Sequence, residues 1–144
     1  MPDYTIGVDM GGTNLRVAAI TTDGQLLEKI TLGVKVAMGR DYVIGEMCDA
    51  IHSLTDKYRG IGTFVGAGIG VPGIIDVPAG IMRKSANLPG WTDYPVREVI
   101  EKRLAFWVTV ALAVLIAGFV AVVYLPTMSW WPAMPQWLNF CPSK

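Results

Sequence analysis

Two apolar strands joined by a glycine-rich polar turn are expected near the start of the chain. Residues 4–8 are mainly apolar, Asp9 ends this run, and a second apolar run covers residues 15–20. Between the runs, Gly11 and Gly12 permit a tight turn and a close approach of the backbone to a ligand. Successive backbone N–H groups in such a turn form a concave anion site. The segment therefore indicates a phosphate-binding loop, with an ordinary hairpin turn as the alternative.

Polar side chains around this turn suit a phosphate group and its metal ion. Thr13 and Asn14 add side-chain donors, and Asp9 stands where a carboxylate can hold a hydrated metal ion beside the anion. No Gly-Lys-Ser/Thr sequence follows the glycines and no helix is expected after them, which excludes a Walker A loop and a dinucleotide-binding fingerprint. The candidate phosphate-binding residues are Asp9, Gly11, Gly12, Thr13 and Asn14, with Asp9 also the candidate metal ligand.

The remainder of the first hundred residues predicts an α/β domain. Alternating apolar residues and an Asp-Gly turn predict a three-stranded meander over residues 4–33. Apolar residues three and four apart predict a helix over residues 41–58, where His52, the only histidine, is expected at the helix surface. A glycine-spaced strand and its turn are expected over residues 61–77, and a second helix over residues 96–104.

Three short motifs in this region resemble those of one enzyme family. They are Asp9-x-Gly11-Gly12-Thr13-Asn14-x-Arg16, Gly70-x-Pro72-Gly73 and Asn87-Leu88-x-Gly90-Trp91. In this order they resemble the ROK sugar kinases, the glucokinase-like group of the actin/hexokinase-like ATPases, over residues 4–104. The resemblance implies a partial ribonuclease H-like lobe with a mixed sheet. It also implies ATP-dependent phosphorylation of a hexose such as glucose, with ATP and Mg²⁺ at the first motif and with Gly73 and Asn87 contacting the sugar.

The composition changes abruptly near the end of the second expected helix. Residues 104–125 carry no charged side chain, although the whole chain holds 12 Lys and Arg and 12 Asp and Glu. A helix of this length spans roughly 30 Å, about the thickness of the hydrocarbon core of a bilayer. We therefore expect a transmembrane helix over residues 105–125, between a lobe at 1–104 and an irregular tail at 126–144. The alternative is a buried strand at Val108–Leu112 followed by a core helix.

The charges on the amino side of this apolar run predict its orientation. By the positive-inside rule, Lys102 and Arg103 place residues 1–103 in the cytoplasm and the tail outside. The equal numbers of acidic and basic residues give no support to nucleic-acid binding driven by overall charge. Association into a homo-oligomer stays open, because an incomplete lobe leaves apolar surface uncovered.

The resemblance also implies a catalytic base that this sequence does not contain. In the family, a strand after the second helix ends in Asn-Asp, and that Asp accepts the proton of the attacking sugar hydroxyl. Here the matching stretch reads Val108-Thr109-Val110-Ala111-Leu112-Ala113, and no carboxylate side chain follows Glu101. We therefore expect no catalytic residue in this chain, and interpret it as a kinase lobe truncated, shifted or fused near residue 104.

Three functions compete for such a chain. The first is an ATP-dependent sugar kinase, and the second is a membrane-anchored lobe that binds a ligand or partner without catalysis. The third is a ROK transcriptional repressor, which is disfavoured because the phosphate strand begins at residue 4 and leaves no room for an amino-terminal helix-turn-helix. The missing carboxylate discriminates between the first two functions: the chain favours the first for its ancestry and the second for its activity.

Overall fold

The computed structural model describes residues 3–85, 87–106 and 108–112. A three-stranded meander comes first, followed by a short 3₁₀ turn, a long helix, a strand, a small hairpin, a second helix and a last strand. These elements are β1 (Tyr4–Met10), β2 (Asn14–Thr21), β3 (Leu26–Gly33), η1 (Val36–Met38), α1 (Arg40–Tyr58), β4 (Phe64–Val71), β5 (Ile74–Asp76), β6 (Ile81–Lys84), α2 (Val96–Leu104) and β7 (Val108–Leu112).

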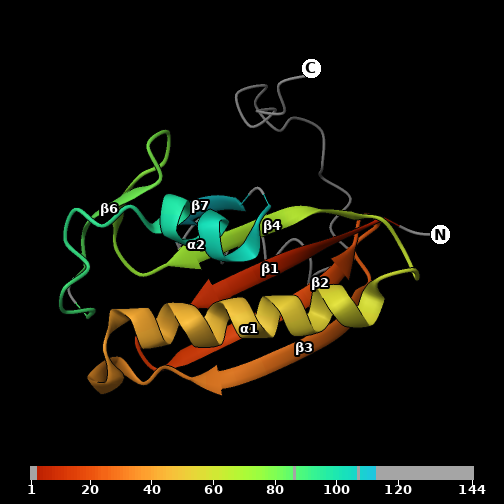
Figure 1. Cartoon of the computed structure of the whole chain (residues 1–144), viewed down its shortest axis with the longest axis horizontal. Coiled ribbons are helices and arrows are strands. Elements are labelled where there is room, and N and C mark those ends of the chain that lie inside the picture. Colours follow the sequence, from red (N-terminus) through yellow and green to blue (C-terminus); the bar gives the residue numbers. More distant parts are fainter. Residues whose placement is uncertain (1–2, 86, 107, 113–144) are drawn as a thin grey trace, which may run out of the picture.

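Five strands form one mixed sheet in the order β3-β2-β1-β4-β7 (Figure 1). The antiparallel pairing of β1 with β2 and of β2 with β3 confirms the predicted meander. β4 runs parallel to β1, and β7 runs parallel to β4, so the carboxyl ends of these three strands lie at one edge. In the register of the sheet, Asp9 stands beside Gly70, and Gly70 beside Ala111. The segments that follow these strands therefore meet at the edge where open α/β sheets bind ligands.

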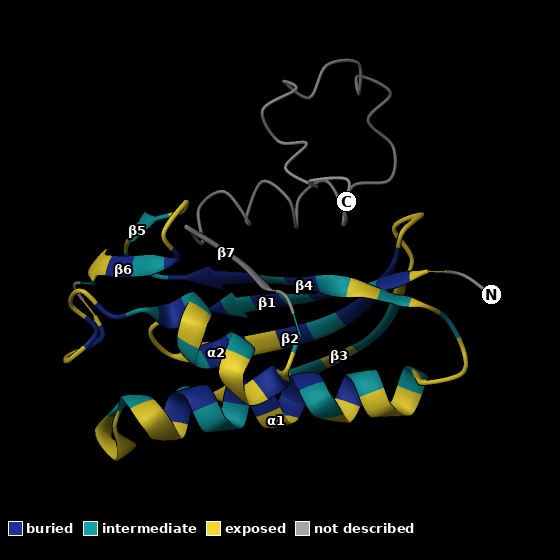
Figure 2. Ribbon diagram, turned by 45° about the horizontal axis from the view of Figure 1, so that its top comes forward, coloured by how far each residue is buried: buried dark blue, intermediate teal, exposed yellow. Residues whose placement is uncertain are grey.

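Both helices cover the same face of the sheet (Figure 2). On that face the alternate residues Ile6, Val8 and Met10 of β1 are buried, as the two-residue period of a strand requires. The buried stripe of α1 includes Val43, Ile44, Met47, Ile51 and Leu54. Burying side chains of this size stabilises the fold by about 1.5–3 kcal/mol each. The predicted helix over residues 41–58 is confirmed, and its packing holds β1, whose carboxyl end carries Asp9.

Residues 108–112 form strand β7 and not the start of a transmembrane helix. α2 ends at Leu104, because Ala105 adopts a left-handed backbone with φ of 57°. β7 then pairs with β4 along five residues. The predicted membrane helix over residues 105–125 is therefore wrong for this stretch, and the alternative strand at Val108–Leu112 is confirmed. Hydropathy could not distinguish a membrane helix from this strand, because a strand in the parallel part of a sheet is also a continuous apolar run.

The rest of the predicted membrane span, residues 113–125, and the predicted tail, residues 126–144, lie outside the described residues. Within the ranges that are described, no helix combines the length and the apolar character needed to cross a membrane.

Candidate functional site

The glycine turn connects β1 to β2 at the carboxyl edge of the sheet. The Gly11 N–H donates to the Asn14 carbonyl oxygen at 2.8 Å, and the Val34 N–H donates to the Thr13 carbonyl oxygen at 2.8 Å. Gly12, Thr13 and Asn14 are exposed. In the part of the chain that the structure describes, the amides of Gly12 and Thr13 donate to no backbone carbonyl. Two backbone donors at the tip of a closed turn can bind an anion.

Asp9 lies next to this turn, near the end of β1. Its carboxylate is one-third exposed and forms an ion pair with Arg16 on β2, with an Nη1–Oδ2 distance of 3.0 Å. Arg16 is exposed, and the strand register places it directly opposite Asp9. Among the described residues no group of three or more His, Cys, Asp or Glu could enclose a metal ion. A single carboxylate such as that of Asp9 could still contact a hydrated Mg²⁺, since Mg²⁺ keeps several of its waters.

Gly73, a candidate sugar contact, follows β4 and is tightly packed. A Cβ atom at this position would lie 2.6 Å from the Lys84 carbonyl oxygen and 3.2 Å from the Met82 sulfur. The Ser85 hydroxyl donates to the Pro72 carbonyl oxygen at 2.6 Å, which joins the two ends of the β5–β6 hairpin. The backbone at Gly73 is therefore held in one place, and only glycine fits there.

Asn87, the other candidate sugar contact, lies against the glycine turn. A Cβ atom placed on Gly12 would be 3.6 Å from Asn87 Cβ and 3.8 Å from its Nδ2. Asn87 is exposed, while Leu88 and Trp91 beyond it are buried and anchor the segment. The first and third motifs are thus brought close together although more than half of the described chain separates them. An exposed amide beside two free backbone donors can bind a hydroxyl next to a phosphate.

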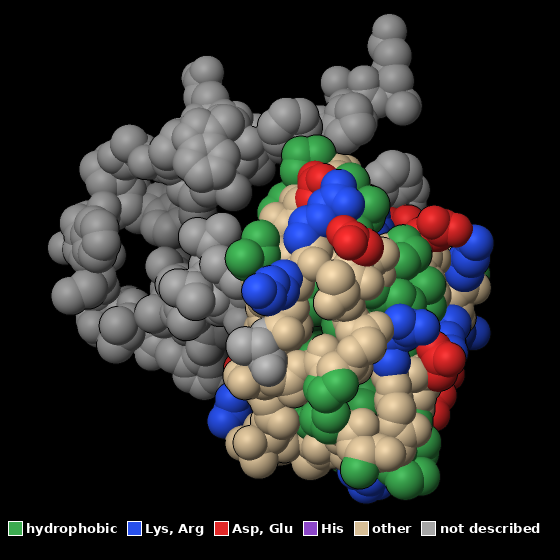
Figure 3. All heavy atoms as spheres, turned by 90° about the vertical axis from the view of Figure 1, so that its left-hand side faces the viewer, with side chains coloured by type: hydrophobic (Ala, Val, Ile, Leu, Met, Phe, Trp, Pro, Cys, Tyr) green, Lys and Arg blue, Asp and Glu red, His purple; other side chains and the backbone are tan. Residues whose placement is uncertain are grey.

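Figure 3 looks onto this edge of the molecule, where basic and acidic side chains lie next to one another and do not gather in one charged patch. Arg83 belongs to one such group, because its guanidinium contacts Asp76 at 2.7 Å and Asp93 at 3.2 Å. The hydrogen bond from Arg83 lowers the pKa of Asp76 below its ordinary value. A carboxylate held in this way is a poor general base, because a base works best with a pKa near the working pH.

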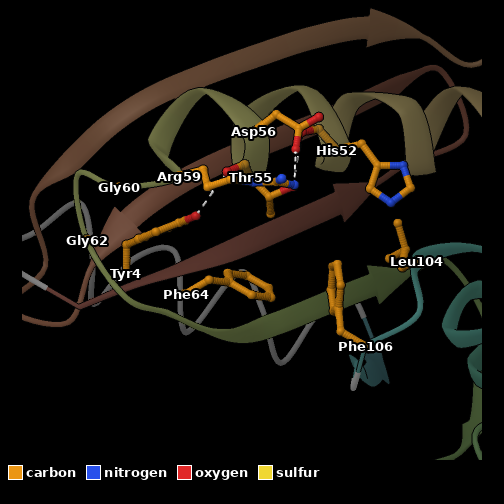
Figure 4. A pocket seen from close by; sticks show the side chains of 10 residues that line it. All are labelled: Tyr4, His52, Thr55, Asp56, Arg59, Gly60, Gly62, Phe64, Leu104 and Phe106. Carbon is orange, nitrogen blue, oxygen red and sulfur yellow. Dashed lines mark hydrogen bonds and ion pairs between the residues drawn. The ribbon is translucent and has the colours of Figure 1, made fainter.

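A pocket of about 340 Å³ lies at the opposite edge of the sheet. Tyr4 and Phe64, the first residues of β1 and β4, form an aromatic wall with Phe106 (Figure 4). His52 and Thr55 of α1 line the other side. None of the predicted phosphate or sugar residues lines this pocket. Gly12, Thr13, Asn14 and Asn87 of the predicted site are instead exposed at the carboxyl edge.

Two contacts that shape the carboxyl edge were not predicted from the sequence. They are the hydrogen bond from Ser85 to Pro72 and a hydrogen bond of 2.6 Å from Arg40 Nη1 to the Gly90 carbonyl oxygen. The second joins residues 50 positions apart in the sequence. Both acceptors are backbone carbonyls, which every residue carries, so no residue pattern marks them.

Comparisons with known proteins agree with the motifs. The model of the ROK family matches residues 5–117. The chain is 38% identical over 98 residues to a glucokinase from Thermotoga maritima, which covers 68% of this chain and 30% of that protein. It is 26% identical over 102 residues to a putative xylose repressor from a Caldicellulosiruptor species, which covers 68% of this chain and 25% of that protein. The chain thus spans less than a third of the length of either relative.

A solved structure shares the fold. A ROK family glucokinase from Streptomyces griseus, in complex with glucose and AMPPNP, superposes with a TM-score of 0.67. The match is 21% identical and covers 84% of this chain and 36% of that chain. The α/β mixed sheet expected from the sequence is therefore confirmed, and its fold resembles part of that ROK family structure.

Proposed function

This chain belongs to the ROK family, and from that premise we propose that it forms the phosphate- and sugar-binding half of a glucokinase-type site. In this proposal the turn at Gly11–Asn14 binds phosphates of ATP, and Gly73 and Asn87 bind a hexose such as glucose. The glucokinase named above, at 38% identity, supports the choice of sugar and of reaction class.

The observation that carries the proposal is the proximity of Gly12 and Asn87: a Cβ atom added to Gly12 would lie 3.6 Å from Asn87 Cβ. Phosphoryl transfer requires the terminal phosphate and the accepting hydroxyl to be adjacent and in line. An amide offers both donors and acceptors to neighbouring hydroxyls of a sugar. A hexose bound by Asn87 would therefore present a hydroxyl beside phosphates bound at the glycine turn.

A magnesium ion fits this arrangement through Asp9. When bound, such an ion would neutralise charge that develops on the phosphates. Asp9 would hold it through water from the end of β1, and the exposed Arg16 would hold the carboxylate in place. The other residues of the turn would orient the phosphates by backbone and hydroxyl hydrogen bonds.

Binding without turnover is the expected behaviour of this chain on its own. No carboxylate follows Glu101 in the sequence, and Asp76 is held by Arg83 with a lowered pKa. Asp9 and Asp93, the other carboxylates named at this edge, are each paired with an arginine, so in this proposal none of the three serves as the base for the hydroxyl proton. Sugar binding without phosphoryl transfer is the second candidate function, and it is favoured by this missing base together with the similarity to a xylose repressor.

Titration of the isotopically labelled full chain with glucose and with AMPPNP tests the proposal. Asn87→Ala should weaken glucose binding about tenfold, because each lost hydrogen bond contributes about 0.5–1.5 kcal/mol. AMPPNP binding should stay within about twofold. Gln25→Ala is the matched control, because this exposed amide lies in the turn after β2, at the other edge of the sheet. Unchanged glucose binding by the Asn87→Ala variant would refute the assignment of Asn87 to the sugar. In a separate assay with ATP, glucose-dependent consumption of ATP would refute the absence of turnover.

A further inference from the structure

Arg40, the first residue of α1, reaches across to the turn that follows Asn87. Its Nη1 donates to the Gly90 carbonyl oxygen at 2.6 Å. Gly90 has φ of 79°, a backbone conformation that favours glycine. The start of the longest helix is thereby tied to the loop that carries the third motif.

The same guanidinium also packs on an aromatic ring. Its central carbon lies 3.9 Å from the centroid of the Tyr94 ring, within the range of a cation–π interaction. Tyr94 in turn meets Trp91 edge-to-face, with the two centroids 5.5 Å apart. Trp91 is only 1% exposed. Arg40 therefore contacts the turn at two points. It donates to the Gly90 carbonyl oxygen, and it stacks on the Tyr94 ring, which packs against the buried Trp91.

The two contacts of Arg40, with Gly90 and with Tyr94, act on a short segment whose ends are fixed by hydrogen bonds. The Met82 N–H donates to the Tyr94 carbonyl oxygen at 2.9 Å, and the Tyr94 N–H donates to the Met82 carbonyl oxygen at 3.0 Å. These bonds close the segment between β6 and Tyr94 into a loop. Asn87 lies inside that loop with its side chain exposed and against Gly12, so the orientation of the loop decides where the amide stands.

We propose that Arg40 is a positioning residue for sugar binding, which fixes the amide of Asn87 against the glycine turn. The sugar-binding part of this statement rests on the function proposed above. In this proposal Arg40 acts through its contacts with Gly90 and Tyr94 and not as a direct ligand of phosphate or sugar. A planar guanidinium can donate in its plane and stack on a ring at the same time, which an ammonium group cannot do.

Two variants and one control separate this role from general stabilisation. Arg40→Met removes both contacts, and Arg40→Lys keeps a cation near Tyr94 without the planar fork. Arg59→Met is the control, because Arg59 lies at the other end of α1, where it is exposed and pairs with Asp56. In the labelled full chain, glucose affinity should fall about tenfold in Arg40→Met and less in Arg40→Lys, while AMPPNP affinity stays within about twofold. Arg59→Met should change neither affinity.

A second measurement needs no ligand. In the wild-type chain a nuclear Overhauser effect between Gly12 Hα and Asn87 Hβ should be present, and it should weaken or vanish in Arg40→Met and remain in Arg59→Met. If the wild-type chain shows no response to glucose, the sugar assignment fails, while this effect still decides the role of Arg40. An effect of wild-type strength in both Arg40 variants would overturn the proposal. Equal losses of glucose and AMPPNP affinity would also overturn it, because they would indicate only a general loss of stability.

Discussion

Replacing Gly73 with alanine should destabilise the chain without introducing any polar or charged group. The added Cβ would lie 2.6 Å from the Lys84 carbonyl oxygen, 3.2 Å from the Met82 sulfur and 3.3 Å from Ser85 Cβ. The sulfur belongs to a flexible side chain and can move. The Lys84 oxygen cannot move alone, because Lys84 is paired with Ile74 across the β5–β6 hairpin. The backbone must therefore shift on one side of the contact.

The loss of stability depends on which atom the added Cβ would overlap. Overpacking of a well-packed site costs about 1–3 kcal/mol. A value near 2 kcal/mol is expected because the closest contact is backbone, and the φ of Gly73 lies outside the left-handed region, so no conformational penalty adds to it. For a domain of this size, that change lowers the midpoint of thermal unfolding by roughly 5–15 °C.

Urea and thermal unfolding of the full chain, followed by circular dichroism, measure this difference. Gly33→Ala is the matched control, because Gly33 is exposed and an added Cβ there meets nothing within 4 Å. Its free energy of unfolding should stay within about 0.5 kcal/mol of wild type. If Gly73→Ala has the same unfolding midpoints in urea and on heating as this control, the close packing around Gly73 does not constrain the chain, and the reasoning from packing is wrong.

Three further outcomes are expected. Asp9→Ala should remove most of the Mg²⁺ dependence of AMPPNP binding in titrations with and without the ion, while changing the free energy of unfolding by less than about 1 kcal/mol, as for exposed ion pairs. The hydrogen bond from Lys35 lowers the pKa of Glu46 below 4.5, so its stabilising contribution is present above that pH and lost as the pH falls through the lowered pKa. Glu46→Gln should therefore flatten the fall of the urea midpoint between about pH 6 and pH 3; an unchanged slope would contradict this. Burial raises the pKa of Cys48 to about 11, so in a Cys141→Ser background the native chain should react with a thiol reagent at pH 8 far more slowly than the chain in urea.

The parts of the fold that depend on local sequence were predicted well. The meander follows from alternating apolar residues and from two turns rich in glycine and polar residues, which act over a few positions. The helix over residues 41–58 follows from apolar residues three and four apart, and it differs from α1 by one residue at its start. The turn at Gly11–Asn14 was placed for the same reason, since its closing hydrogen bond spans only three residues.

The parts that depend on distant partners could not be predicted in this way. Val108–Leu112 is apolar whether it spans a membrane, lies in a core helix or pairs with β4, and only the open edge of β4 decides between these outcomes. The proximity of Asn87 to Gly12 and the hydrogen bond from Arg40 to Gly90 involve backbone groups, which no motif encodes. Family resemblance brought Asn87 into the candidate set, but its place beside the glycine turn comes from the tertiary structure.

The central position of β1 also sets an order of events for a growing chain. β1 pairs on one side with β2, its immediate successor, and on the other side with β4, which follows the whole of α1. Closing a short loop is fast, whereas pairing across a long sequence separation is slow. On the ribosome the hairpin with its glycine turn can therefore close before β4 has been made. Until β4 arrives, one side of β1 remains an unpaired edge that can bind another nascent strand.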